Sequence, residues 1–129
     1  METRCNQPLV VIQVNTSFQE KYSSPVEGKY VHAYRVTIEN RNDFPIQLMR
    51  RSWIISEGNG IIRRVNGEGV LGQQPIIQPG GTFQYISWSS LQLNVGKMEG
   101  IYFMHNLRDG LSFSVDIPPF LLVAPDLLN

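Results

Sequence analysis

The segment from Gly67 to Gly72, GEGVLG, has the most chemically suggestive spacing in this 129-residue chain. It matches G-x-G-x-x-G, a pattern in which glycines let the backbone approach a pyrophosphate at the start of a helix. That mechanism requires a helix directly after the third glycine. Here Gln73-Gln74-Pro75 and the strand-like pair Ile76-Ile77 follow instead. The sequence therefore does not predict a dinucleotide-binding site.

A smaller anion remains compatible with this loop. Backbone N–H groups of Gly67, Gly69 and Gly72 could form a concave anion-binding nest without any helix. Arg63 and Arg64 lie just upstream, where they could donate charge-assisted hydrogen bonds to a phosphate or pyrophosphate. The alternative, which the sequence favours, is that the glycines only permit positive φ and a close approach of the loop to a sheet.

Two tryptophans are candidates for partner contact. Arg50 and Arg51 stand beside Trp53 on an expected strand, and Arg and Trp are both enriched in binding hot spots. Trp53 alternates with Ile55 on an expected strand, however, which favours a position between two sheets. Trp88 lies in the weakly patterned segment Ser87-Trp88-Ser89-Ser90. We therefore expect Trp53 in the core and keep Trp88 and Arg50 as candidate partner contacts.

Metal-binding and catalytic patterns are missing from the sequence. His32 and His105 are far apart, Cys5 stands near the start of the chain, and neither C-x-x-C nor H-x-x-x-H occurs. There is no G-x-S-x-G nucleophile motif. Isolated carboxylates remain compatible with a hard-cation site, although their spacing does not match a calcium-binding loop. We expect a non-enzymatic protein with no metal and no cofactor, and a hydrolase acting on phosphate compounds is a remote alternative.

Charge and composition limit the partners. Lys plus Arg and Asp plus Glu number 11 each, so the formal net charge is zero, which argues against nucleic acid as a partner. One cysteine cannot form an intrachain disulfide. The first eight residues have no apolar core of a secretory signal, and no apolar run reaches membrane-spanning length. We expect a cytoplasmic protein with no membrane contact.

Apolar side chains alternate with period two along most of the chain, which is typical of β-strands. Seven or eight short strands separated by turn residues predict an all-β sandwich or barrel. The expected strands cover 10–14, 29–39, 46–55, 61–65, 76–77, 83–85, 98–104 and 111–117.

Three details of these strands are more specific. The apolar phase shifts within 46–55, which predicts a β-bulge near Met49 to Arg51. The weak pattern of 88–97 predicts a long connection. Pro118-Pro119 is expected to end the last strand, where Leu111, Phe113, Val115 and Ile117 share one face, and residues 120–123 are expected to pack on the sandwich as a tail.

Several motifs in this order resemble the ApaG domain family. They are YVHAYRVTIEN (30–40), QLMRRSWIISEGNG (47–60) with its Arg-x-Trp, GEGVLGQQP (67–75) followed by QPG, GKMEG (96–100) with Tyr102, and FSVDIPPF (113–120). Two places depart from the family pattern. Trp88 stands where that pattern has a small residue, and residues 105–110 differ from its usual acidic turn.

The resemblance implies a fibronectin type III- or immunoglobulin-like sandwich of two antiparallel sheets over residues 9–124, with tails at 1–8 and 125–129. Bacterial members are linked to cobalt and magnesium tolerance. Similar domains occur in F-box and polymerase-delta-interacting proteins, which implies a protein-binding module. We expect another protein as the partner, a phosphate-type anion as the alternative ligand, and edge strands that could also join two copies of the chain.

Overall fold

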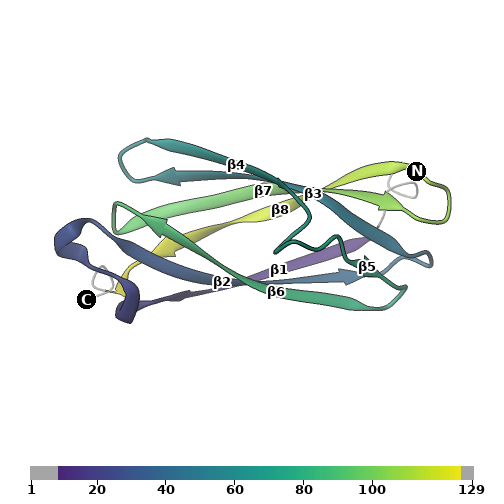
Figure 1. Ribbon diagram of the computed structural model, residues 1–129, viewed down its shortest axis with the longest axis horizontal. Coiled ribbons are helices and arrows are strands. Elements are labelled where there is room, and N and C mark those ends of the chain that lie inside the picture. Colours follow the sequence, from purple (N-terminus) through teal and green to yellow (C-terminus); the bar gives the residue numbers. More distant parts are fainter. Residues whose placement is uncertain (1–8, 126–129) are drawn as a thin grey trace, which may run out of the picture.

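The computed structural model describes residues 9–125, and this part of the chain forms eight strands in two antiparallel sheets packed as a sandwich (Figure 1). Of the expected tails at 1–8 and 125–129, only Pro125 is described; the other residues, Cys5 among them, lie outside the described part of the chain. The elements are β1 (Val10–Phe18), η2 (Glu20–Tyr22), η3 (Pro25–Glu27), β2 (Tyr30–Asn40), β3 (Ile46–Glu57), β4 (Ile62–Glu68), β5 (Ile76–Ile77), β6 (Thr82–Leu91), β7 (Val95–Asn106) and β8 (Ser112–Val123), where η marks a single 3-10 turn.

The two sheets differ in the number of their strands. One has the order β1-β2-β6, and the other has the order β4-β3-β7-β8 with the short β5 also pairing β3. Strands β1 and β8 contact each other along one side of the sandwich. On the other side β4 and β6 are edge strands, and the end of β6 approaches the start of β4 at the left of Figure 1. This leaves one open side to the sandwich.

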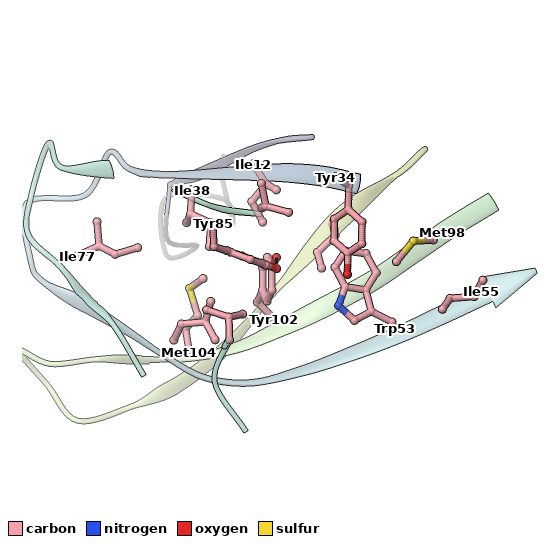
Figure 2. Close-up of a cluster of buried hydrophobic side chains, with 14 of the residues drawn as sticks. Ile12, Tyr34, Ile38, Trp53, Ile55, Ile77, Tyr85, Met98, Tyr102 and Met104 are labelled. Carbon is pink, nitrogen blue, oxygen red and sulfur yellow. Dashed lines mark hydrogen bonds between the residues drawn. The ribbon is translucent and has the colours of Figure 1, made fainter. Parts of the chain in front are cut away.

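The core lies between the sheets and confirms the alternation expected from the sequence. Trp53 is 2% exposed and packs edge-to-face against Tyr34. The hydroxyl groups of Tyr85 and Tyr102 hydrogen-bond to each other in the middle of the core (Figure 2). Each buried hydroxyl therefore has a partner, as buried polar groups require. The buried apolar residues include Ile12, Val36, Ile38, Ile46, Leu48, Ile55, Ile77, Leu91, Met98, Met104, Ile117 and Leu122.

The predicted β-bulge in the second long strand is confirmed. Leu48 pairs with Met104 and Arg50 pairs with Phe103, so Met49 is the one residue of β3 without an opposite residue on β7. Ile46 and Leu48 face the core before this point, and Trp53 and Ile55 face it afterwards. The extra residue therefore turns Arg51 towards the inner face, on the side of Trp53.

The long connection expected in 88–97 is wrong. Strand β6 continues through Leu91 and β7 already begins at Val95, so only three residues connect them. The apolar pattern fails here because two of the inward positions of β6 carry serine, at Ser87 and Ser89. These serines still alternate with the exposed side chains of Trp88 and Ser90. The strand is regular, and only the polarity of its inner face changes.

The end predicted for the last strand is also wrong, because Pro118-Pro119 lies inside β8 and residues 120–123 belong to the same strand. Met98 pairs with Phe120 and Gly100 pairs with Ile117, so two prolines oppose the single residue Glu99. A bulge on an edge strand tolerates proline because no ladder hydrogen bond is needed from its nitrogen. At the other end, Leu111 is exposed and precedes β8, contrary to the expectation that it shares a strand face with Phe113, Val115 and Ile117.

Candidate functional site

A cleft of about 260 Å³ opens between the two sheets on the open side of the sandwich. Its walls come from β3, β4 and β7 on one side and from β2 and the second half of β6 on the other. No lining residue is acidic, and two are arginines. The lining residues are Tyr34, Arg51, Trp53, Ile55, Arg63, Val65, Ser87, Trp88, Ser89, Ser90 and Met98. We refer to this space as the interlayer cleft.

Arg51 is held in the interlayer cleft by two backbone carbonyl groups. Its Nη1 donates to the carbonyl oxygen of Gly69 at 2.7 Å and to that of Glu68 at 3.2 Å. The guanidinium group lies over Gly67, where an added Cβ would come within 2.7 Å of Nη1. Glycine at position 67 therefore makes room for the arginine, and the carbonyl groups of the next two residues fix its direction.

Arg63 joins the two edge strands across the cleft opening. Its Nη2 donates to the carbonyl oxygen of Ser90 at 3.1 Å, so a residue of β4 is attached to β6. Within residues 9–125 the ion pairs join Arg41 to Glu39, Lys97 to Glu99 and Arg108 to Asp43. Neither cleft arginine takes part in one of them. Two guanidinium charges thus lie at one cleft without a carboxylate partner from this part of the chain.

The opposite wall supplies hydroxyl groups. Ser89 is 8% exposed, and its Oγ has no hydrogen-bond partner among the described residues. Burial raises the pKa of Tyr34, whereas a hydrogen bond with Ser87 and the charge of Arg51 act in the opposite direction. The Arg51 charge likewise opposes the burial that raises the pKa of Tyr85. The positive charge of Arg51 therefore affects the pKa of two tyrosines in the interior of the sandwich.

The structure brings together some of the residues that the sequence suggested. Arg63 and Trp88 line the interlayer cleft, and Gly67 and Gly69 contact the arginine within it. Gly67, which the sequence placed in a loop, is part of β4 and opposite Arg51. The Gly69 N–H donates to the carbonyl oxygen of Met49 at 2.8 Å. These two glycines therefore serve the sheet and the position of Arg51.

Other suggested residues lie elsewhere. Gly72 has a φ of 77° and lies in the tight turn between Val70 and Gln73. Arg64 is not among the residues that line the cleft; it is exposed and follows Arg63 on β4, so its side chain points to the opposite face. Arg50 stacks over the Phe103 ring at 4.6 Å on the outer face of the same sheet. These residues do not form one site with the cleft.

Sequence reasoning considered Arg51 only together with Arg50, as a partner contact beside Trp53, and it did not select Ser87 or Ser89 as site residues. The predicted bulge held the signal for Arg51, because a phase shift at Met49 places it on the same face as Trp53. The signal for the serines was the alternation after Tyr85, which continues in polar residues. Polar side chains at inward positions of a strand indicate an interior that is open to solvent or to a ligand.

A second surface lies on the outer face beside the same edge strand. Trp88 is 50% exposed and Tyr22 is 54% exposed, and their rings meet edge-to-face at 5.3 Å. Ile86, two residues earlier on β6, is 48% exposed. The Lys21 ammonium lies 5.9 Å from the Tyr22 ring. We refer to Tyr22, Ile86 and Trp88 as the edge patch.

His32 lies next to Ser89 in the register of β2 and β6, is 1% exposed, and its Nε2 has no partner among the described residues. Burial lowers the pKa of His32 below its ordinary value of 6.5. The unfolded chain therefore binds a proton that the folded state resists. The contribution of neutral His32 to the free energy of unfolding is fully present above pH 6.5. It is lost as the pH falls from 6.5 towards the pKa of His32 in the folded state.

We expect the free energy of unfolding to decrease as the pH falls below 6.5, and His32→Gln to flatten this decrease. Urea unfolding at a series of pH values measures the slope for each variant. His105→Gln is the control, because it retains His32 and should retain the wild-type slope. An equal slope for wild type and His32→Gln would contradict the prediction.

Two properties of the described residues concern metals and membranes. Within 9–125, no three His, Cys, Asp or Glu side chains gather so that they could hold a metal ion. No helix in that range is long and apolar enough to cross a membrane.

Comparisons with known proteins agree on one family. The sequence pattern of the ApaG domain matches residues 20–106. Protein ApaG of Escherichia coli (strain K12 / DH10B) is 45% identical over 124 residues, which covers 96% of this chain and 98% of that protein. Protein ApaG of Edwardsiella ictaluri is 43% identical over 122 residues, with 95% and 97% covered.

A solved structure gives the same result in three dimensions. The crystal structure of the ApaA protein from Bordetella pertussis superposes with a TM-score of 0.88 and 37% sequence identity. The superposition covers 92% of this chain and 95% of the other. The match from 20 to 106 contains every lining residue of the interlayer cleft and all three residues of the edge patch.

Proposed function

Because this chain belongs to the ApaG domain family, we propose that it is a non-enzymatic binding module whose partner is another protein. The observation that supports this most directly is the edge patch. Clustered exposed aromatic and aliphatic side chains are typical of protein-interaction sites, and Trp and Tyr are over-represented among residues that dominate binding energy.

The edge patch lies beside a strand that can accept another strand. Strand β6 has β2 as its strand partner on one side only. In an antiparallel pair every second residue directs its N–H and C=O groups away from the partner. The Ser90 carbonyl, which accepts from Arg63, points to this open side. By the same alternation the backbone groups of Ile86 and Trp88 point there too.

An extended segment of the partner could therefore pair with residues 84–88 of β6. Backbone hydrogen bonds would provide affinity, and the Ile86 and Trp88 side chains would contact alternate residues of the added strand. The proposal places the complex in the cytoplasm. The link to cobalt and magnesium tolerance that the family resemblance implies would depend on this complex, because the proposal assigns no metal ligand and no catalytic residue to the chain.

Crosslinking in native cells followed by mass spectrometry tests the proposal and locates the contact. The three lysines of the chain are Lys21, Lys29 and Lys97. Lys21 lies at the edge patch, whereas Lys97 lies on β7 of the other sheet. We expect one protein to crosslink through Lys21 in preference to Lys97. Trp88→Ala should greatly reduce this crosslink, because it removes the largest exposed ring of the patch.

Leu121→Ala is the matched control, since Leu121 is 62% exposed on β8 and lies outside the patch. It should leave the crosslink unchanged. Three outcomes would contradict the proposal: a partner attached mainly through Lys97, capture that Trp88→Ala does not reduce, or a second copy of this chain as the attached protein.

A further inference from the structure

The interlayer cleft carries an excess of positive charge. Arg51 and Arg63 both line a space of about 260 Å³, and none of the other lining residues is acidic. The chain as a whole has equal numbers of acidic and basic residues. A local excess of two positive charges at one concave site attracts anions, since clefts with low-dielectric walls focus the field.

Both guanidinium groups are pre-oriented and still have donors to offer. An arginine has five N–H donors. Among the described residues, the hydrogen bonds of Arg51 use Nη1 alone and that of Arg63 uses Nη2 alone. Because backbone carbonyl groups already fix these side chains, less side-chain entropy remains to be lost when a ligand binds.

The facing wall adds a polar atom that needs a partner. The Ser89 Oγ is buried and makes no hydrogen bond within the described residues. A buried hydroxyl group without a partner is unfavourable. Ser87 lies two residues earlier and lines the same space. Hydroxyl donors on β6 thus face guanidinium donors on β3 and β4.

We propose that the interlayer cleft is a binding site for a phosphate group, held by Arg51 and Arg63 from one wall and by Ser87 and Ser89 from the other. Donors that converge from several strands suit a tetrahedral oxoanion, which accepts hydrogen bonds in several directions, better than a planar carboxylate. The space lies below the usual size of pockets for drug-sized ligands. A phosphate group fits within a space of this size.

This site differs from the anion nest that the sequence suggested. The Gly69 N–H already donates to the Met49 carbonyl oxygen, so it is not available to an anion. In the proposed site the glycines only position Arg51, which contacts the ligand. The inference also goes beyond the proposed protein-binding function and does not depend on it. The group could belong to a free phosphate compound or to a phosphorylated side chain, and both present the same chemistry to the cleft.

Titration of the ¹⁵N-labelled protein with inorganic phosphate at millimolar concentration tests the site. We expect NMR shifts at the amides of residues 87–90 and at the Arg51 side-chain Nε–H. Arg63→Gln should weaken binding about tenfold or more, because a charge-assisted hydrogen bond is lost. Arg64→Gln is the matched control. It removes the same charge from the adjacent residue, which points away from the cleft, and should bind phosphate as the wild type does.

Further arms identify the source and the class of the anion. Tighter binding of O-phosphoserine than of inorganic phosphate would support a phosphorylated side chain, and the reverse order would support a free phosphate compound. Arg51→Lys, which retains the charge but loses the planar donor set, should also weaken binding if the protein stays folded, and its amide spectrum reports folding directly.

Four results would overturn the proposal. They are no shift at millimolar phosphate, shifts confined to residues 67–72, equal weakening by Arg63→Gln and Arg64→Gln, and an equal response to acetate. None of these results would affect the edge patch, which the Trp88→Ala crosslinking experiment tests separately.

Discussion

Replacement of Trp53 by alanine is expected to lower the free energy of unfolding by about 3–5 kcal/mol, the range for deleting a large aromatic side chain from a packed core. Trp53 is 2% exposed. Its ring centroid lies 5.6 Å from that of Tyr34, 5.9 Å from Phe120 and 6.3 Å from Tyr102. Alanine would leave a cavity where strands of both sheets meet, and three rings would lose their edge-to-face partner.

Urea unfolding followed by circular dichroism measures this loss as a shift of the midpoint with an unchanged slope. Trp88→Ala is the control, because it removes the same side chain from a half-exposed position. It should cost about 1 kcal/mol or less, mostly from its contact with Tyr22. Equal costs for the two variants would show that Trp53 does not support the core as described.

Gly69→Ala is expected to destabilise the protein by about 2–5 kcal/mol, from the combined costs of steric overlap and an unfavourable backbone conformation. Gly69 has a φ of +59°, and an added Cβ would lie 1.9 Å from the carbonyl oxygen of Gln73. That atom belongs to the backbone and accepts the Val70 N–H, so it cannot move aside freely. The same change would displace the Gly69 carbonyl that holds Arg51.

Gly72→Ala separates the two contributions within one motif. Gly72 also has positive φ, at +77°, but an added Cβ would meet no atom within 4 Å. We therefore expect only the conformational cost of about 1–2 kcal/mol. Thermal unfolding of both variants gives the comparison. If Gly72→Ala destabilised the protein as much as Gly69→Ala, the close approach at Gln73 would not be the reason for the first glycine.

The glycines of the G-x-G-x-x-G pattern also show how far such a pattern can be interpreted. The absence of a following helix was sufficient to reject a dinucleotide site, and the structure places Gly67 on a strand. The structural role of each individual glycine could not be predicted from the sequence. That depends on Gln73 folding back over Gly69 and on the Arg51 side chain crossing Gly67, and both contacts are set by the path of the chain in space.

The same distinction holds for the strands. Period-two alternation predicted β2 and β3 closely, because their inner faces carry apolar residues such as Val36 and Trp53. The alternation failed to predict the end of β6, because inward positions there carry polar residues. It also failed across Pro118-Pro119, because two prolines lie inside β8. In the first case the inner face borders a cleft, and in the second the prolines occupy a bulge on an edge strand.

By itself, the sequence determined that two β layers enclose Trp53, that the strand shifts phase near Met49 to Arg51, and that no helix follows the glycines, since each of these depends on side-chain periodicity over a few neighbouring residues. Only the tertiary structure decided that Arg51, Arg63 and Ser89 share one cleft while Arg50 and Arg64 do not. The physical reason is that β3, β4 and β6 are brought together across two sheets, and the pairing of distant strands depends on the packing of the whole core.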